Sequence, residues 1–72
     1  MALTGNQRWA EELDFTIEEW SPQGSIIEML GRVHLYEMAA SAYSAAARMR
    51  PAGIIRLRRG AMVLKERIPS DE

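Results

Sequence analysis

The sequence contains no cysteine and only one histidine. A chain without cysteine cannot form disulfide bonds or thiolate metal sites, so packing or oligomerisation has to stabilise it. No apolar run approaches the roughly 20 residues that a membrane span needs, and the N-terminus lacks the basic and apolar pattern of a signal peptide. We therefore expect a cytoplasmic protein without membrane contact.

The 72 residues are enough for one small domain, and 47% of them are hydrophobic. A chain of this size buries only ~60% of the surface that its unfolded form exposes, so its core is marginal. The net charge is −1, but residues 1–47 are mainly acidic and residues 48–67 are mainly basic. All the cations except Lys65 are arginines, which favour planar, bidentate ion pairs.

Alternating hydrophobicity predicts a half-buried strand over residues 13–20, because the apolar residues Leu13, Phe15 and Ile17 recur with a period of two. Residues 21–24 read Ser-Pro-Gln-Gly, which is typical of a type I turn. Residues 1–12 are expected to form an irregular or briefly helical arm whose Trp9 docks on the body.

Residues 25–50 have the composition of a helix, with many Ala, Leu, Met, Glu and Arg. Ser25 and Glu28 have the capping-box spacing, and Pro51 stops propagation. The polar residues change sides near Gly31, and glycine costs roughly 1 kcal/mol against alanine inside a helix. We expect a short helix over residues 25–31 and a longer one over residues 34–50, or one helix kinked between them.

Residues 54–68 are expected to form a β-hairpin, and residues 69–72 a frayed tail. A two-residue turn at Arg59 and Gly60 would place the four apolar residues of the hairpin on one face: Ile55, Leu57, Met62 and Leu64. Arg59 would then stand where positive φ is preferred, so a three-residue turn with a bulge is an alternative.

The order strand, helix or helices, strand, strand predicts one domain, a small two-layer α+β sandwich with a three-stranded sheet. The most apolar strand, the second of the hairpin, is expected in the centre and antiparallel to both neighbours. The alternative places the strand of residues 13–20 beside the first strand of the hairpin and parallel to it. The predicted core consists of Leu13, Phe15, Ile17, Ile55, Leu57, Met62 and Leu64 against Ile27, Leu30, Tyr36, Ala39, Ala40 and Tyr43.

Trp20, an Ala-rich helix, Pro51 and the run I-x-L-R-x-G-A-x-V-L from Ile55 to Leu64 together resemble a group of short, uncharacterised bacterial proteins. The resemblance covers roughly residues 14–66. Many of those proteins read Ala-Arg-Val where this chain has Ala-Met-Val at residues 61–63. The resemblance supports the strand–helix–hairpin order and implies no activity.

Few residues suggest catalysis or metal binding. His34 has no cysteine or second histidine to complete a usual metal set, so we interpret it as a locally hydrogen-bonded residue. The acidic cluster of Glu11, Glu12, Asp14, Glu18 and Glu19 is interpreted as a solvated face that pairs with arginines. Phosphate-binding and nucleophile motifs are missing. We therefore expect no enzyme activity, cofactor or small-molecule substrate.

The hairpin suggests a basic patch of Arg56, Arg58, Arg59 and Lys65, with Arg56, Arg58 and Lys65 on the outer face. Such a patch could bind nucleic-acid phosphates. The competing interpretation is that acidic residues of the first strand neutralise the patch through cross-strand pairs.

The second half of the helix is apolar over about twice the ~100° that a sheet would cover. A stripe on its other side follows a three–four spacing and predicts a self-association face made of Leu35, Met38, Ala42, Ala45 and Met49. The leading hypothesis is a non-catalytic protein-interaction module, either a homodimer or a module that docks on a larger protein partner. The alternative is a nucleic-acid-binding accessory protein that uses the arginine hairpin.

Overall fold

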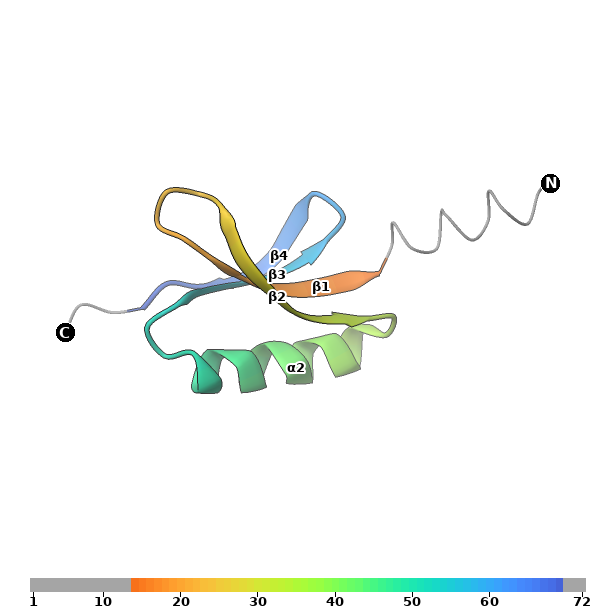
Figure 1. The fold of residues 1–72 in the computed structure, drawn as a ribbon. Coiled ribbons are helices and arrows are strands. Elements are labelled where there is room, and N and C mark those ends of the chain that lie inside the picture. Colours follow the sequence, from red (N-terminus) through yellow and green to blue (C-terminus); the bar gives the residue numbers. More distant parts are fainter. Residues whose placement is uncertain (1–13, 70–72) are drawn as a thin grey trace.

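The computed structural model describes residues 14–69. Four strands form an antiparallel sheet in the order β2-β1-β3-β4, and one face of this sheet is covered by the helix α2 (Figure 1). The elements are β1 Phe15–Trp20, β2 Ile26–Val33, α2 Tyr36–Met49, β3 Ile54–Arg59 and β4 Met62–Arg67. The predicted α+β class is confirmed, but the sheet has four strands where we expected three.

The predicted first strand is confirmed as β1, which lies in the centre of the sheet. Its apolar residues Phe15 and Ile17 are buried on the helix-covered face, as the period of two required. The predicted arm with Trp9, and Leu13 of the predicted core, lie outside the described residues.

The first predicted helix is wrong, because residues 26–33 form the edge strand β2. The turn at residues 21–24 is where we expected it, with the Gly24 amide donating to the Ser21 carbonyl at 3.0 Å, but it joins two strands. Two register irregularities interrupt the β1–β2 pairing, one opposite Ile17/Glu18 and one opposite Glu19/Trp20. Each β-bulge adds a residue to one strand, so the sequence of β2 shows no regular alternation.

The second predicted helix is confirmed as α2. It begins after Leu35, which provides no side-chain cap, and its last turn is closed by the Arg50 amide donating to the Ala46 carbonyl at 2.9 Å. Pro51 follows directly and cannot continue the helix. Ala39 and Ala46 are buried against the sheet, and their small side chains let the helix approach it closely.

The hairpin is confirmed, but its register differs from the two-residue turn we expected. Arg59 pairs with Met62, so the turn consists of Gly60 and Ala61, and Gly60 takes the positive φ of 61°. A bulge between Leu57 and Arg58 then pairs Leu57 with Lys65. Met62 and Leu64, which we expected in the core, are 63% and 37% exposed.

The predicted strand order is also wrong, because β4 lies at the edge and β3 pairs with β1. The alternative order placed these two strands side by side but parallel, whereas they are antiparallel. β1 and β3 are antiparallel because the additional strand β2 reverses the direction of the chain before the helix begins. Apolar residues gave β4 the composition of a central strand, yet most of them face solvent.

The core lies between α2 and the two central strands. It consists of Phe15, Ile17, Ala39, Ala46, Ile55 and Leu57, with Leu30, Val33, Ala42 and Tyr43 packed against it. The Phe15 and Tyr36 rings also meet edge to face, with centroids 5.5 Å apart. Of the remaining predicted core residues, Ala40 is half-buried, whereas Ile27 and Tyr36 are exposed.

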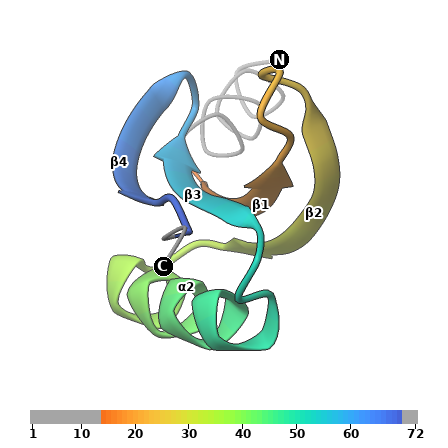
Figure 2. The same ribbon diagram turned by 90° about the vertical axis from the view of Figure 1, so that its left-hand side faces the viewer.

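The sheet is strongly curled, and Figure 2 shows β2 and β4 rising on either side of β1 and β3, away from α2. The second face of the sheet is therefore concave. Alternate residues of the central strands, namely Thr16, Glu18, Trp20, Arg56 and Arg58, belong to this concave face, since their neighbours point to the helix.

Candidate functional site

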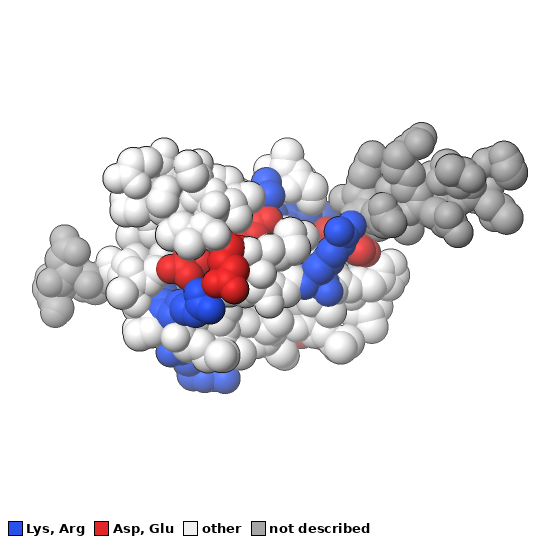
Figure 3. All heavy atoms as spheres, viewed as in Figure 1, with Lys and Arg blue, Asp and Glu red and all other residues white. Residues whose placement is uncertain are grey.

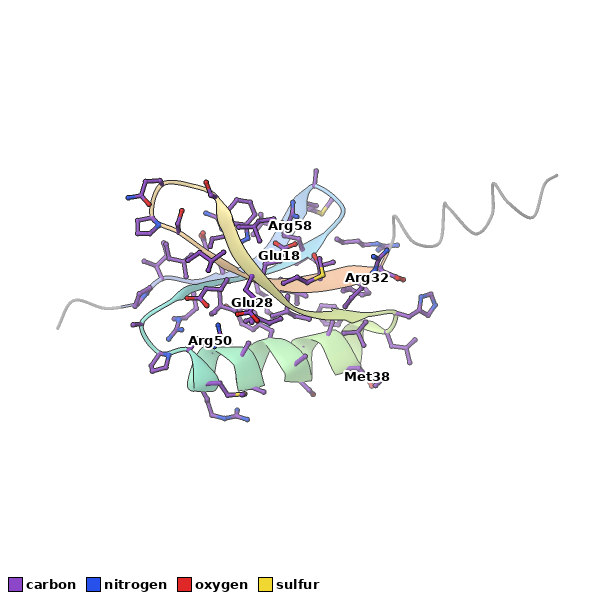
Figure 4. All side chains as sticks on the ribbon, viewed as in Figure 1. Glu18, Glu28, Arg32, Met38, Arg50 and Arg58 are labelled. Atoms are coloured by element: carbon purple, nitrogen blue, oxygen red, sulfur yellow. The ribbon has the colours of Figure 1, made fainter. Side chains whose placement is uncertain are left out.

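The concave face has a buried carboxylate at its centre. Glu18 has no exposed surface, and its two oxygens accept four hydrogen bonds. Arg58 donates from Nε to Oε1 and from Nη2 to Oε2, both at 2.8 Å. Trp20 Nε1 and Thr16 Oγ1 each donate at 2.9 Å, to Oε1 and Oε2 respectively. Figure 4 shows Glu18 and Arg58 directed toward each other.

These contacts determine the charge of the Glu18 carboxyl. Burial alone would raise its pKa, but the hydrogen bonds from Arg58, Trp20 and Thr16, with the charge of Arg58, lower the pKa below its usual range. The hydrogen bonds to Glu18 likewise raise the pKa of Arg58. Glu18 is thus an ionised carboxylate whose acceptor positions are occupied, which suits a structural ion pair better than a general base.

The predicted basic patch does not come together as one surface. Arg56 donates from Nε to Glu66 Oε2 at 2.7 Å, and its guanidinium lies 4.5 Å from the Trp20 ring centroid. Arg59 lies over the Phe15 ring instead. Lys65 is on the opposite, helix-covered face, with Nζ 6.0 Å from the Tyr43 centroid.

Two causes divide the patch. The bulge opposite Leu57 turns Lys65 to the face that Leu57 occupies. On the concave face, Glu18 of β1 neutralises Arg58, as the competing interpretation expected, whereas Arg56 is neutralised by Glu66 of β4, which that interpretation did not name. In the view of Figure 3, acidic and basic side chains also meet above the C-terminal end of α2, without an extended area of one sign.

A second charged cluster fixes the C-terminal end of α2. Arg50 Nη1 donates to Glu19 Oε1 of β1 at 2.6 Å and to Glu28 Oε1 of β2 at 3.0 Å. From the other side, Arg67 Nη2 donates to the carbonyls of Arg50, at 2.6 Å, and Gly53, at 3.1 Å. The carbonyl of the C-cap residue Arg50 is thus bonded to the end of β4. The cluster joins three strands to the helix end.

An apolar groove of about 360 Å³ opens between α2 and β2. Its floor includes Ile17, and one end is closed by Glu28 and Arg50. The walls are the β2 residues Met29, Leu30 and Gly31 and the α2 residues Ala42, Ala45, Ala46 and Met49. Gly31 does not have positive φ, and a Cβ there would lie 3.6 Å from Ile17 Cδ1, in ordinary contact. Its backbone therefore does not require glycine, and an added side chain would narrow the groove.

The predicted self-association face borders this groove. Ala42, Ala45 and Met49 line it, whereas Leu35 and Met38 stand beyond its end, both 57% exposed. Met49 is 75% exposed. Figure 4 places Met38 at the end of the helix opposite Arg50. The sequence placed these residues on the side of the helix away from the sheet, but Ala42 packs against the core, and the misassigned β2 hid the groove that Ala42, Ala45 and Met49 line.

Glu11 and Glu12 of the predicted acidic cluster lie outside the described residues, whereas Asp14 lies beside His34 and Arg32. His34 Nδ1 lies 3.3 Å from Asp14 Oδ1, and Asp14 Oδ2 accepts from Arg32 Nε at 3.3 Å. The imidazole is mostly exposed. No cluster of three metal-ligating side chains is found within residues 14–69. In the same part of the chain, no helix is long and apolar enough to cross a membrane.

The sequence-based interpretation of the acidic cluster missed the burial of Glu18. It treated the face opposite the apolar residues as solvated. The signal was that Thr16, Glu18 and Trp20 share that strand face, so a hydroxyl and an indole N–H flank the carboxylate. Both are hydrogen-bond donors that a buried carboxylate needs.

Comparisons with known proteins add no functional information. No protein-family model matches the chain, and no curated protein or solved structure matches it significantly.

Proposed function

We propose that the protein is a small, non-catalytic interaction module that self-associates or docks on a larger protein partner. The observation that carries this proposal is the apolar surface along one side of α2, where Leu35, Met38 and Met49 are exposed beside an apolar groove. Several large apolar side chains exposed on one side of a helix are typical of protein–protein contact sites. A second copy of the chain is the simplest partner, because two-fold dimers are the commonest oligomers.

Sedimentation equilibrium over micromolar concentrations tests self-association. We expect a reversible dimer, and we expect Met38→Glu to weaken it, because the new carboxylate would have to be desolvated in the interface. Ser44→Glu is the matched control, since Ser44 is exposed on the polar side of the same helix. Ala42→Glu is a poorer probe, because Ala42 packs against the core.

A strictly monomeric wild-type protein would contradict self-association and leave a larger protein as the partner of this surface. A dimer that Met38→Glu and Ser44→Glu affect equally would contradict the proposed surface.

The alternative, nucleic-acid binding through the hairpin, has less support. Non-specific affinity for DNA comes mostly from uncompensated positive charge, and Glu18 and Glu66 already pair with Arg58 and Arg56. A salt titration with random duplex DNA separates the two functions. Micromolar binding that weakens steeply with salt, with a flatter slope in an Arg56→Ala, Arg59→Ala double variant that keeps the buried Arg58, would favour the alternative.

A further inference from the structure

We infer that the outer edge of β4 is a second interaction surface, which binds an extended acidic segment of another protein as a fifth strand of the sheet. This surface is separate from the apolar side of α2, so the inference goes beyond the proposed self-association and does not depend on it. It rests on an open strand edge and on positive charge that the ion pairs of the chain leave uncompensated.

The edge of β4 is open to a further strand. Within residues 14–69, β4 pairs only with β3, and Figure 2 shows it as the outermost strand on its side of the sheet. Residues 62–66 are all exposed, including Met62 at 63% and Val63 at 47%. The edge of a sheet presents a row of unpaired N–H and C=O groups, with which an extended peptide can form a new strand pair.

The helix-covered face of the hairpin carries uncompensated positive charge. Three cations share this face through their strand pairing, namely Arg59, Lys65 and Arg67. None of them forms an ion pair with a carboxylate within residues 14–69. The only carboxylate of the hairpin, Glu66, pairs with Arg56 on the concave face. Lys65 and Arg59 are exposed, whereas Arg67 is half-buried and contributes charge more than contact surface. These cations favour an anionic partner.

The spacing of the cations on β4 defines the sequence that the partner strand needs. Lys65 and Arg67 lie two residues apart on one face, and Glu66 between them faces the other way. A strand beside β4 meets both cations if every second residue is acidic. The residues between have to be uncharged, because a carboxylate opposite Glu66 would be repelled. Apolar residues there also suit the exposed Val63 on the concave side. The partner segment thus alternates acidic and apolar residues.

Two other occupants fit this edge less well. An antiparallel pair of β4 strands from two copies, centred on Glu66, would place Lys65 of each copy against Arg67 of the other and Glu66 against itself. A nucleic acid could use the cations, but it would use neither the strand edge nor the exposed Met62 and Val63. An acidic extended peptide uses all three features.

The opposite edge of the sheet is less suited to strand addition. Two register irregularities interrupt β2, and its Glu28 and Arg32 are paired with Arg50 and Asp14. β4 has one irregularity, and Lys65–Arg67 lies beyond it in regular register. The charge and the regular backbone therefore coincide on β4.

Fluorescence anisotropy at low salt, with a labelled synthetic peptide of alternating glutamate and valine, tests the inference. We expect saturable binding that Lys65→Glu weakens by roughly tenfold, since an attractive cross-strand pair becomes a repulsive one. Arg48→Glu is the matched control, because Arg48 is an exposed cation of α2 without an ion pair in the described residues. Circular dichroism controls for folding. No binding by the wild-type protein, or equal weakening by both substitutions, would overturn the inference.

A second peptide separates strand addition from general attraction between charges. It has the same side chains, but every backbone nitrogen is methylated, so it cannot donate hydrogen bonds to the strand edge. We expect its binding to be lost, and retained binding would overturn strand addition. Tighter binding of single-stranded oligothymidine than of the acidic peptide, with the same dependence on Lys65, would overturn the inference in favour of a nucleic acid. Neither result bears on self-association, which sedimentation equilibrium measures separately.

Discussion

The guanidinium of Arg58 meets the carboxylate of Glu18 through two parallel hydrogen bonds of 2.8 Å, across the central strand pair of the sheet. Both side chains lie on the face opposite the helix, where Trp20 adds a hydrogen bond to the carboxylate and a ring surface for the guanidinium. The concave face therefore carries a buried ion pair that contributes to the stability of the fold.

Loss of Arg58 should be strongly destabilising. Arg58→Met leaves the Glu18 carboxylate buried without its cation, and breaking such pairs typically costs roughly 3–5 kcal/mol. In a Glu18→Gln background the same change should cost much less, because no buried charge remains. Urea unfolding of the two single variants and the double variant measures this coupling, and additive losses would contradict it.

Glu18 should also make stability fall in acid. Its pKa in the folded state is lowered from the ordinary 4.5, so its contribution is complete above that pH and is lost as the pH falls through the folded value. We expect the free energy of unfolding to decrease below about pH 4.5, with a shallower decrease in Glu18→Gln. Urea titrations between pH 3 and 7 test this, and parallel curves for both proteins would assign the acid sensitivity to other carboxyls.

Two leucines of the hairpin should respond differently to truncation. Leu57 is fully buried, and Leu57→Ala should cost roughly 2–5 kcal/mol. Leu64 is 37% exposed at the bulge, so Leu64→Ala should cost clearly less. Thermal melts of the two variants test the register. Equal losses of stability would mean that Leu64 is buried in the core as Leu57 is.

Gly53 should be intolerant of a side chain for a reason that involves Glu19. A Cβ at Gly53 would lie 2.6 Å from Glu19 Oε2 and 3.1 Å from its Cγ, and Arg50 holds this carboxylate in place. Gly53→Ala should therefore cost about 1–2 kcal/mol. The cost should shrink in a Glu19→Ala background, and Gly31→Ala is the control in which a Cβ meets only ordinary contacts. If Glu19→Ala left the cost of Gly53→Ala unchanged, the cause would be the backbone conformation at residue 53 and not the Glu19 carboxylate.

The elements that sequence patterns predicted are those whose periodicity is regular. Strand β1 alternates regularly over residues 15–18, and α2 combines strong helix formers with Pro51 just after its end. Strand β2 was missed because two bulges remove its alternation. Its Met, Leu, Glu and Arg residues also fit a helix, so only pairing with β1 decides its conformation.

The same limit applies to the candidate sites. The spacing of Ala42, Ala45 and Met49 put these residues on one side of α2, which depends on the helix alone, but the groove that they line depends on β2 and was not expected. The Glu18–Arg58 pair joins residues forty positions apart in sequence, and the facing of Lys65 depends on one bulge. Neither follows from local pattern, because the strand order and register are set by the whole sheet.

The strand order β2-β1-β3-β4 has a consequence for how the chain folds. The β1–β2 and β3–β4 pairs are local hairpins, which form on microsecond timescales, whereas the β1–β3 pair joins Ile17 to Leu57 across the whole of β2 and α2. The β1–β3 pairing, which completes the core, is therefore also the most distant in sequence. Because its formation has the largest loop-closure entropy cost, we expect it to be the rate-limiting step of folding. Each hairpin can open at its outer strand without undoing this pairing, so the slowest backbone amides to exchange should be those shared by β1 and β3.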